Sequence, residues 1–257
     1  MCIKRLVRSG LGMLLVTFLL MFSLILVPVN ANAAGTTSLT ITKLASDGLT
    51  VLSQKTVTYQ ELEAGELSDG TTIDVMGDGE TQYYHQGPVF IDDPDSETQE
   101  ALRWNPEENT NIETKSMGAV KGTNVKDLCE LVGGMEEGDE IQIKAIDGFK
   151  KTFAYKNVYE YSDIEGPMAV CWYKDGEFPD GGYRDGMRLV WFADTSVNPW
   201  GYNVFGNWDW HEAADPEYWY YYNLEYPTTT GLSVQNVSQL IIYNETAPVT
   251  PKAAFTA

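Results

Sequence analysis

The chain has 257 residues, with 37 acidic and 17 basic side chains and a formal net charge of −20 at pH 7. A surface this acidic repels nucleic acid, anionic lipid and phosphate-rich ligands, which excludes nucleic-acid binding as a function. The length and the 43% of hydrophobic residues are enough to build one sizeable core.

Residues 1–33 have the three parts of a secretory signal peptide. Three basic residues precede an almost wholly apolar run at 11–28, and the small residues that signal peptidase needs follow at 31–33. We therefore expect cleavage and a secreted or cell-envelope location, with a retained membrane anchor as the alternative. Without this segment, 14 basic and 37 acidic residues remain, a formal charge of −23.

After that segment we expect a single domain at residues 34–244, a flexible tail at 245–257 and no integral membrane segment. Two cysteines remain, Cys129 and Cys171, each within an apolar stretch. Free cysteine behaves as a small buried hydrophobe, so we favour two buried thiols, with a disulfide between them as the alternative.

In the amino-terminal half, short runs of alternating apolar and polar residues predict strands at 38–44 and 51–57, arranged as a hairpin or a meander. A threonine and a glutamate at the two ends of 58–61 predict a capped helical turn. Residues 66–80 are rich in glycine and aspartate and predict turns. Residues 91–116 are polar, with little periodicity, and predict a long surface loop.

The clearest elements lie further along the chain. Apolar residues with helical spacing follow Asn124 and end before Gly133, which predicts a helix. Many short strands with one clear helix predict an α+β fold of mixed, mainly antiparallel sheets. The strands are expected at 140–146, 149–155, 168–173, 185–193 and 237–243.

Several of these segments, taken in order, resemble the molybdopterin-binding domain of the sulfite-oxidase superfamily. The sequence from Gly122 to Cys129 is similar to that family's Gly-Val-x-Leu-x-Asp-Leu-Leu helix, and 147–149 is similar to its Asp-Gly-Tyr turn. The step at 57–62 and the strands at 185–190 and 234–240 are similar to three more of its segments. The resemblance implies a sulfite-oxidase-like molybdopterin-binding-domain fold.

The chain more closely resembles exported archaeal and bacterial members that share a Phe-Gly-Asn-Trp-Asp segment, here at 205–209, and lack the molybdenum-ligating cysteine. Where catalytic members carry that thiolate, residues 82–88 read Gln-Tyr-Tyr-His-Gln-Gly-Pro, and imidazole is a different ligand from a soft thiolate. Basic partners for a cofactor phosphate are few upstream, namely Arg103, Lys115 and Lys121. The resemblance therefore implies a ligand-binding protein without molybdenum catalysis, with a molybdopterin-dependent oxidoreductase as the alternative.

The chain has two histidines, His85 and His211, in separate polar and aromatic segments. If both segments open on one face, the two imidazoles with Asp209 or Glu212 could bind Zn²⁺ or another divalent ion. The alternative is that each histidine hydrogen-bonds within its own loop.

Aromatic residues crowd the stretch 191–226, with 13 in 36 residues against a chain average of 12%. Tryptophan and tyrosine combine an apolar face with a polar edge, so among acidic residues they could stack sugar rings or hold an organic cation. Five consecutive aromatics at 218–222 cannot all face inward on a strand or a helix. We expect part of the stretch in the core and part on an exposed binding wall.

Together these patterns predict an exported protein that binds a small molecule or glycan between the His85 loop and the aromatic stretch. A carbohydrate-binding or surface-adhesion module is a further alternative. For Arg188 we favour an ion pair with Asp185 or Asp194 over binding of an anion. The candidate ligand-binding residues are Tyr84, His85, Gln86, Arg188, Trp208, Asp209, Trp210 and His211, and the candidate metal ligands are His85, His211 and Glu212.

Overall fold

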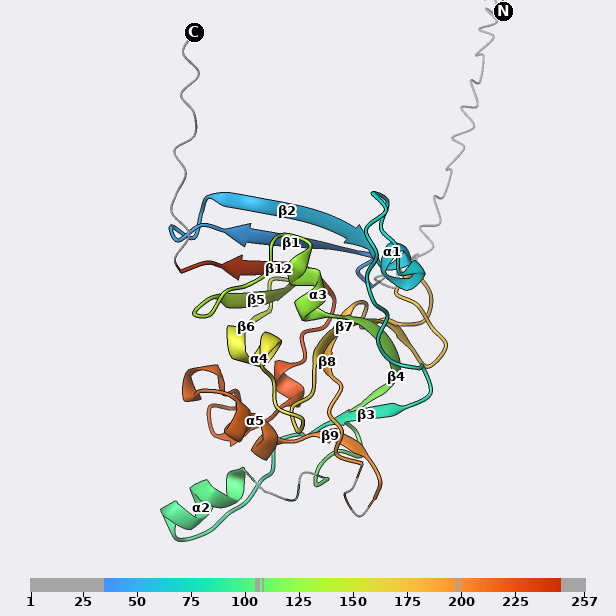
Figure 1. Ribbon diagram of the computed structural model, residues 1–257. Helices are drawn as coiled ribbons and strands as arrows, with labels where there is room; N and C mark the ends of the chain where they lie inside the picture. The colour runs from blue at the N-terminus through green and yellow to red at the C-terminus, as the bar shows by residue number, and fades with distance from the viewer. Residues whose placement is uncertain (1–34, 105–106, 108, 197, 199, 246–257) are drawn as a thin grey trace, which may run out of the picture. The chain divides into compact units, whose positions relative to one another are not determined.

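The computed structural model describes residues 35–104, 107, 109–196, 198 and 200–245. The predicted signal segment, and the predicted tail from residue 246 onward, lie outside these residues. All described residues fall within one compact unit. The predicted fold class is confirmed, because the described chain is a mixed α+β structure with mainly antiparallel sheets and few helices (Figure 1).

The first sheet has the strand order β2-β1-β12-β5-β6. The predicted hairpins form, since β1 pairs antiparallel with β2 and β5 with β6. The central pairing of β1 with β12 is parallel and joins the two ends of the described chain. Its strands are β1 (Ser38–Leu44), β2 (Val51–Thr58), β5 (Glu140–Ala145), β6 (Lys150–Ala154) and β12 (Val237–Tyr243).

The second sheet has the strand order β8-β7-β4-β3-β9 and lies below the first in Figure 1. All its pairings are antiparallel except the one between β3 and β9. That parallel pairing brings the His85 segment beside the aromatic stretch. The strands are β3 (Gln82–His85), β4 (Ser116–Asn124), β7 (Met168–Lys174), β8 (Arg188–Trp191) and β9 (Asn203–Phe205), and a separate ribbon consists of β10 (Tyr221–Tyr222) and β11 (Tyr226–Pro227).

The main core contains residues from both sheets and from α3. Side chains of successive residues alternate across β7, so Val170 joins this core while Cys171 joins a smaller cluster with Met117 and Val190. Burial of both faces explains why 168–173 is a continuous apolar run rather than an alternating one.

The helices are short, and the first three of them, α1, α2 and α3, begin at side-chain caps. Thr58 and Glu61 form the predicted capping box of α1, and Asn124 caps α3 as predicted. The loop prediction for 91–116 was wrong in part, because Asp95 accepts from the backbone N–H of Thr98 and starts a helix there. The helices are α1 (Tyr59–Ala64), α2 (Ser96–Arg103), α3 (Val125–Glu130), α4 (Tyr155–Tyr159) and α5 (Asn207–Ala213), with 3₁₀ turns η1 (Pro216–Tyr218) and η2 (Thr230–Leu232).

Among the described helices, none is long and apolar enough to cross a membrane.

Candidate functional site

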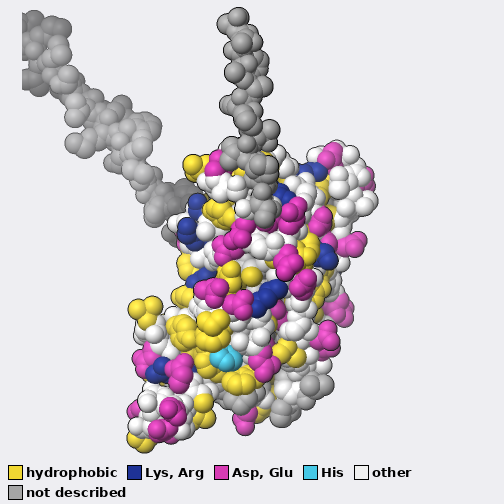
Figure 2. Space-filling view, turned by 60° about the vertical axis from the view of Figure 1, so that its left-hand side comes forward, with side chains coloured by type: hydrophobic (Ala, Val, Ile, Leu, Met, Phe, Trp, Pro, Cys, Tyr) yellow, Lys and Arg dark blue, Asp and Glu magenta, His cyan; other side chains and the backbone are white. Residues whose placement is uncertain are grey.

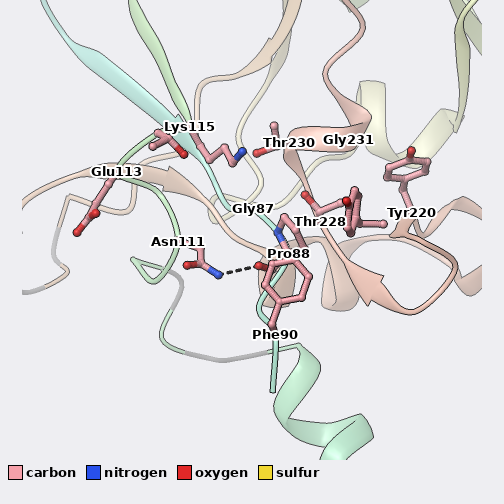
Figure 3. Close-up of a pocket in the computed structure, with 12 residues that line it drawn as sticks. Gly87, Pro88, Phe90, Asn111, Glu113, Lys115, Tyr220, Thr228, Thr230 and Gly231 are labelled. Carbon is pink, nitrogen blue, oxygen red and sulfur yellow. Dashed lines mark hydrogen bonds between the residues drawn. The ribbon is translucent and has the colours of Figure 1, made fainter. Parts of the chain in front are cut away.

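A cleft of about 590 Å³ opens between the chain that follows β3 and the aromatic stretch (Figure 3). We name it the Tyr220 cleft. A pocket was predicted between these two segments, and the cleft lies there. Its lining residues are Gly87, Pro88, Phe90, Asn111, Glu113, Thr114, Lys115, Tyr220, Tyr222, Thr228, Thr230 and Gly231.

The floor of the cleft is a buried hydrogen-bond network around Gln86. The Gln86 carbonyl accepts from the hydroxyls of Thr228 and Thr230 at 3.1 and 3.2 Å, while the Thr229 hydroxyl donates to the Phe205 carbonyl at 2.7 Å. The Gln86 side-chain oxygen accepts from the backbone N–H of Asn207 at 2.7 Å. This network fixes the start of α5, the end of β3 and the threonine segment relative to one another.

Asn207 completes the network from the first residue of α5. Its side-chain amide donates to the carbonyls of Gly87 at 3.2 Å and Pro227 at 3.0 Å, and its oxygen accepts from the backbone N–H of Thr229 at 2.9 Å. Because buried polar groups that are fully paired hold one geometry, the two walls of the cleft are preorganised.

The walls combine aromatic faces with hydrogen-bonding groups. Phe90 and Tyr222 meet edge to face, with ring centroids 6.1 Å apart. In Figure 3, the amine of Lys115 and the hydroxyl of Thr230 point toward one another, and Asn111 donates to the Pro88 carbonyl at 2.6 Å. The cleft therefore presents apolar ring surfaces beside amide, hydroxyl and ammonium groups.

The ring of Tyr220 is held in place by Gly231, within the cleft, and by Lys151, which is not among the lining residues. It packs directly against Gly231, where any Cβ atom would collide with the ring. The Lys151 ammonium lies 3.2 Å from the ring centroid, a close cation–π contact. Burial lowers the pKa of Lys151 to about 8, and the same ammonium lies 5.1 Å from the ring centroid of Phe149.

A second concavity, of about 610 Å³, lies between α2 and α5. We name it the Trp208 pocket. Figure 2 shows a histidine at the surface among hydrophobic side chains with acidic groups near them; of the two histidines, His85 is wholly buried and His211 is partly exposed. The lining residues are Ser96, Glu97, Glu100, Ala101, Trp104, Trp208, His211 and Trp219.

Three of the five consecutive aromatics line these two concavities, Trp219 the Trp208 pocket and Tyr220 and Tyr222 the Tyr220 cleft. Trp219 and Tyr221 contact Trp104, with ring centroids 4.6 and 5.7 Å away, whereas Tyr220 and Tyr222 line the Tyr220 cleft. Alternate residues of an extended chain point to opposite sides, which explains this division. The expectation that the stretch is part core and part exposed is confirmed, because Trp191 and Trp210 are buried while Trp200 and Tyr222 are exposed.

Several predicted ligand-binding residues lie behind the Tyr220 cleft rather than in it. His85 is wholly buried against Trp191 and Phe205, and its Nε2 accepts from the Trp191 backbone N–H at 3.4 Å. Trp210 is also a core residue, whose Nε1 donates to the Tyr218 carbonyl at 3.2 Å.

The other candidates have structural partners as well. Tyr84 packs against Tyr202, with ring centroids 4.6 Å apart. Asp209 is buried at the start of α5 and accepts from the Gly206 backbone N–H at 2.8 Å. Trp208 and His211 line the Trp208 pocket, whereas the other predicted residues line neither of the two named concavities.

Arg188 forms the predicted ion pair with Asp185, with Nη1 and Oδ2 2.6 Å apart. Its Nε donates to the Ser233 hydroxyl at 2.8 Å, and the side chain is buried. The guanidinium joins β8 to the segment before β12, so its contacts are within the fold.

The predicted metal ligands are not gathered. His85 packs with Trp191 and Phe205, whereas the ring of His211 packs with Trp104, Trp208 and Trp219. Glu212 accepts from Trp208 Nε1 at 3.1 Å. In the described part of the chain, no group of three His, Cys, Asp or Glu side chains is arranged to hold a metal ion.

A molybdopterin, which the resemblance implies, would need a thiolate ligand for its metal. Cys129 and Cys171 are free and wholly buried, so the preference for buried thiols is confirmed and the disulfide is not formed. Burial raises the pKa of both thiols, and neither lines either concavity. These residues do not fit a molybdenum site; Cys2 lies outside the described residues.

Sequence reasoning missed most of the Tyr220 cleft. Asn111 and Lys115 come from the segment 91–116, which was predicted to be a long surface loop. Phe90 directly precedes that segment, and Thr228 and Thr230 carried no motif. The triple threonine at 228–230 was the available signal, because clustered hydroxyls often satisfy neighbouring backbone groups.

No protein-family model matches this chain, and no curated protein matches it in sequence. A functional proposal therefore depends on the geometry and chemistry of the described residues.

Proposed function

We propose that this protein is an exported saccharide-binding protein whose binding site is the Tyr220 cleft. The observation that carries the proposal is the pairing of exposed aromatic faces with amide, hydroxyl and ammonium groups on a fixed floor. The signal-like residues 1–33 support export.

The size and lining of the cleft suit one or two sugar rings. Its volume of about 590 Å³ lies within the roughly 300–1,000 Å³ range of small-molecule sites. Sugar rings have apolar C–H faces that pack on tyrosine and phenylalanine, while their hydroxyls pair with threonine, asparagine and lysine side chains. Lys115, as the cation in the lining, adds a partner for a carboxylate-bearing ring.

Binding is favoured over hydrolysis of the sugar. Glycoside hydrolysis ordinarily needs two carboxyl groups that flank the scissile bond. Among the described lining residues the cleft has one carboxylate, Glu113, and its side chain points away from the other labelled side chains (Figure 3).

Isothermal titration calorimetry with a panel of neutral and uronic-acid mono- and disaccharides tests the proposal. We expect binding that weakens by about five- to tenfold in Tyr222→Ala, since one stacking face is lost. Lys115→Gln should weaken the uronic acids more than the neutral sugars. Trp200→Ala is the matched control, because Trp200 is also an exposed aromatic of the same stretch but lies outside the cleft.

Two outcomes would overturn the proposal: no saccharide of the panel binds at millimolar concentration, or Tyr222→Ala and Trp200→Ala change the affinity equally.

A further inference from the structure

The Trp208 pocket differs chemically from the Tyr220 cleft. Three tryptophans and a histidine form its aromatic surface, and Glu97 and Glu100 on α2 supply its charge. Its described lining contains no lysine, arginine, asparagine or threonine. A positively charged group would meet aromatic faces and two carboxylates there, whereas a neutral sugar would leave the charge of those carboxylates unpaired.

The aromatic surface is tightly assembled. The His211 ring centroid lies 4.3 Å from that of Trp104, 4.4 Å from that of Trp219 and 5.2 Å from that of Trp208. Trp104 and Trp219 meet edge to face at 4.6 Å. Such contacts fix the rings before any ligand arrives, which lowers the entropy cost of binding.

Polar contacts outside the pocket hold two of the indoles. Trp208 Nε1 donates to Glu212 at 3.1 Å, and Trp219 Nε1 donates to the Ala214 carbonyl at 3.0 Å. Because these N–H groups are already paired, a ligand would contact the two indoles through their ring faces. An indole face is the strongest of the aromatic partners for a cation.

The charges around the pocket favour a cation. Glu100 pairs with Arg103 at 2.9 Å, but Arg103 also pairs with Glu225 at 3.0 Å, so this one cation is shared between two carboxylates. Burial lowers the pKa of His211, although Glu212 and Glu100 act in the opposite direction. The imidazole is thus neutral at neutral pH and does not repel a cation.

We propose that the Trp208 pocket is a second binding site, for an organic cation with a quaternary ammonium group. The methyl groups of such a cation pack on the faces of the partly exposed Trp208 and Trp219, and its charge lies within the field of Glu97 and Glu100. Metal ions are poor candidates here, because the pocket offers mainly indole rings rather than a ligand set of oxygen, nitrogen or sulfur atoms.

Choline and its uncharged carbon analogue, 3,3-dimethylbutan-1-ol, are the matched probes, because they share a shape and differ in charge. Tryptophan fluorescence and calorimetry on the full protein should show choline binding at least about tenfold tighter than the analogue. Trp208→Ala and Glu97→Gln, two partly or fully exposed positions, should each lower choline affinity, the first by about tenfold.

Cross-controls separate this inference from the saccharide proposal. Tyr222→Ala should leave choline affinity unchanged, and Trp208→Ala should leave saccharide affinity unchanged, because each residue lines one concavity alone. Equal affinity for choline and its uncharged analogue, no choline binding at about 10 mM, or choline binding that Trp208→Ala does not alter would each overturn the inference.

Discussion

Replacing Asn207 by alanine removes a buried side chain that connects three segments around the Tyr220 cleft. The wild-type amide donates to the carbonyls of Gly87 and Pro227 and accepts from the backbone N–H of Thr229. Asn207 is 1% exposed, so water cannot readily replace these partners. The variant would leave two carbonyls and one N–H group buried without their hydrogen bonds.

The expected cost follows from that count. A buried polar group left without its partner costs about 1–3 kcal/mol, so the three groups of Asn207→Ala should cost about 3–6 kcal/mol after partial relaxation. Domains of ordinary stability unfold with about 5–15 kcal/mol, so the loss would be a large share of the total. Asn111→Ala is the control, because its bond to the Pro88 carbonyl is exposed. The lost bond and the left-handed backbone at this position, with φ of 59°, should together cost about 1–2 kcal/mol.

Urea unfolding followed by tryptophan fluorescence measures both variants. We expect the midpoint of Asn207→Ala to fall far below that of Asn111→Ala, with an unchanged slope against urea. Equal losses in the two variants would refute the view that the Gln86 and Asn207 network fixes the cleft. A large loss in Asn207→Ala with fully retained saccharide affinity would refute the link between that network and binding.

Three further predictions concern buried or close-packed groups. Burial raises the pKa of Glu165 from 4.5 to about 8, so between these pH values the folded state keeps a proton that the unfolded state releases, and the free energy of unfolding should fall as the pH rises. In urea unfolding this decline should reach up to roughly 4 kcal/mol in the wild type and should vanish in Glu165→Gln. An unchanged pH slope in the variant would contradict the prediction. Gly231→Ala should displace the Tyr220 ring and lower saccharide affinity in calorimetry, whereas wild-type affinity would mean that this ring does not shape the cleft. Arg188→Met removes a buried ion pair and a hydrogen bond to Ser233. It should lower the free energy of unfolding by about 1–3 kcal/mol and leave saccharide affinity unchanged. A loss of affinity at unchanged stability would instead assign Arg188 to ligand binding.

Local patterns predicted much of the secondary structure. The capping box at Thr58 and Glu61 and the cap at Asn124 are encoded within a few residues, and both helices begin where expected. The hairpin of β5 and β6 follows from alternation on both sides of a turn. Such features depend on neighbours in sequence, which a single chain displays directly.

Contacts between residues far apart in the sequence could not be predicted from such local patterns. The parallel pairing of β1 with β12 joins residues about 200 positions apart, and a parallel pair has no turn to mark it. The α2 helix was missed because it buries none of its residues, so its sequence lacks an apolar stripe. The Asp95 cap was its available signal.

The candidate site was partly predictable for a similar reason. His85 and Trp210 were chosen by residue type, and both turned out to be core residues because their strand and helix face Trp191 and Phe205. The division of Trp219 from Tyr220 and Tyr222 between two concavities could have been predicted, since alternate residues of an extended chain point to opposite sides.

Methyl NMR on threonine-labelled protein tests the saccharide site most directly, because Thr228 and Thr230 line the Tyr220 cleft while Thr40 and Thr56 lie on the distant β1–β2 hairpin. During titration with the tightest saccharide of the panel, the methyl signals of Thr228 and Thr230 should shift and saturate at the calorimetric affinity, with those of Thr40 and Thr56 unmoved. Saturable binding that leaves the signals of Thr228 and Thr230 in place would contradict the assignment of the Tyr220 cleft as the binding site.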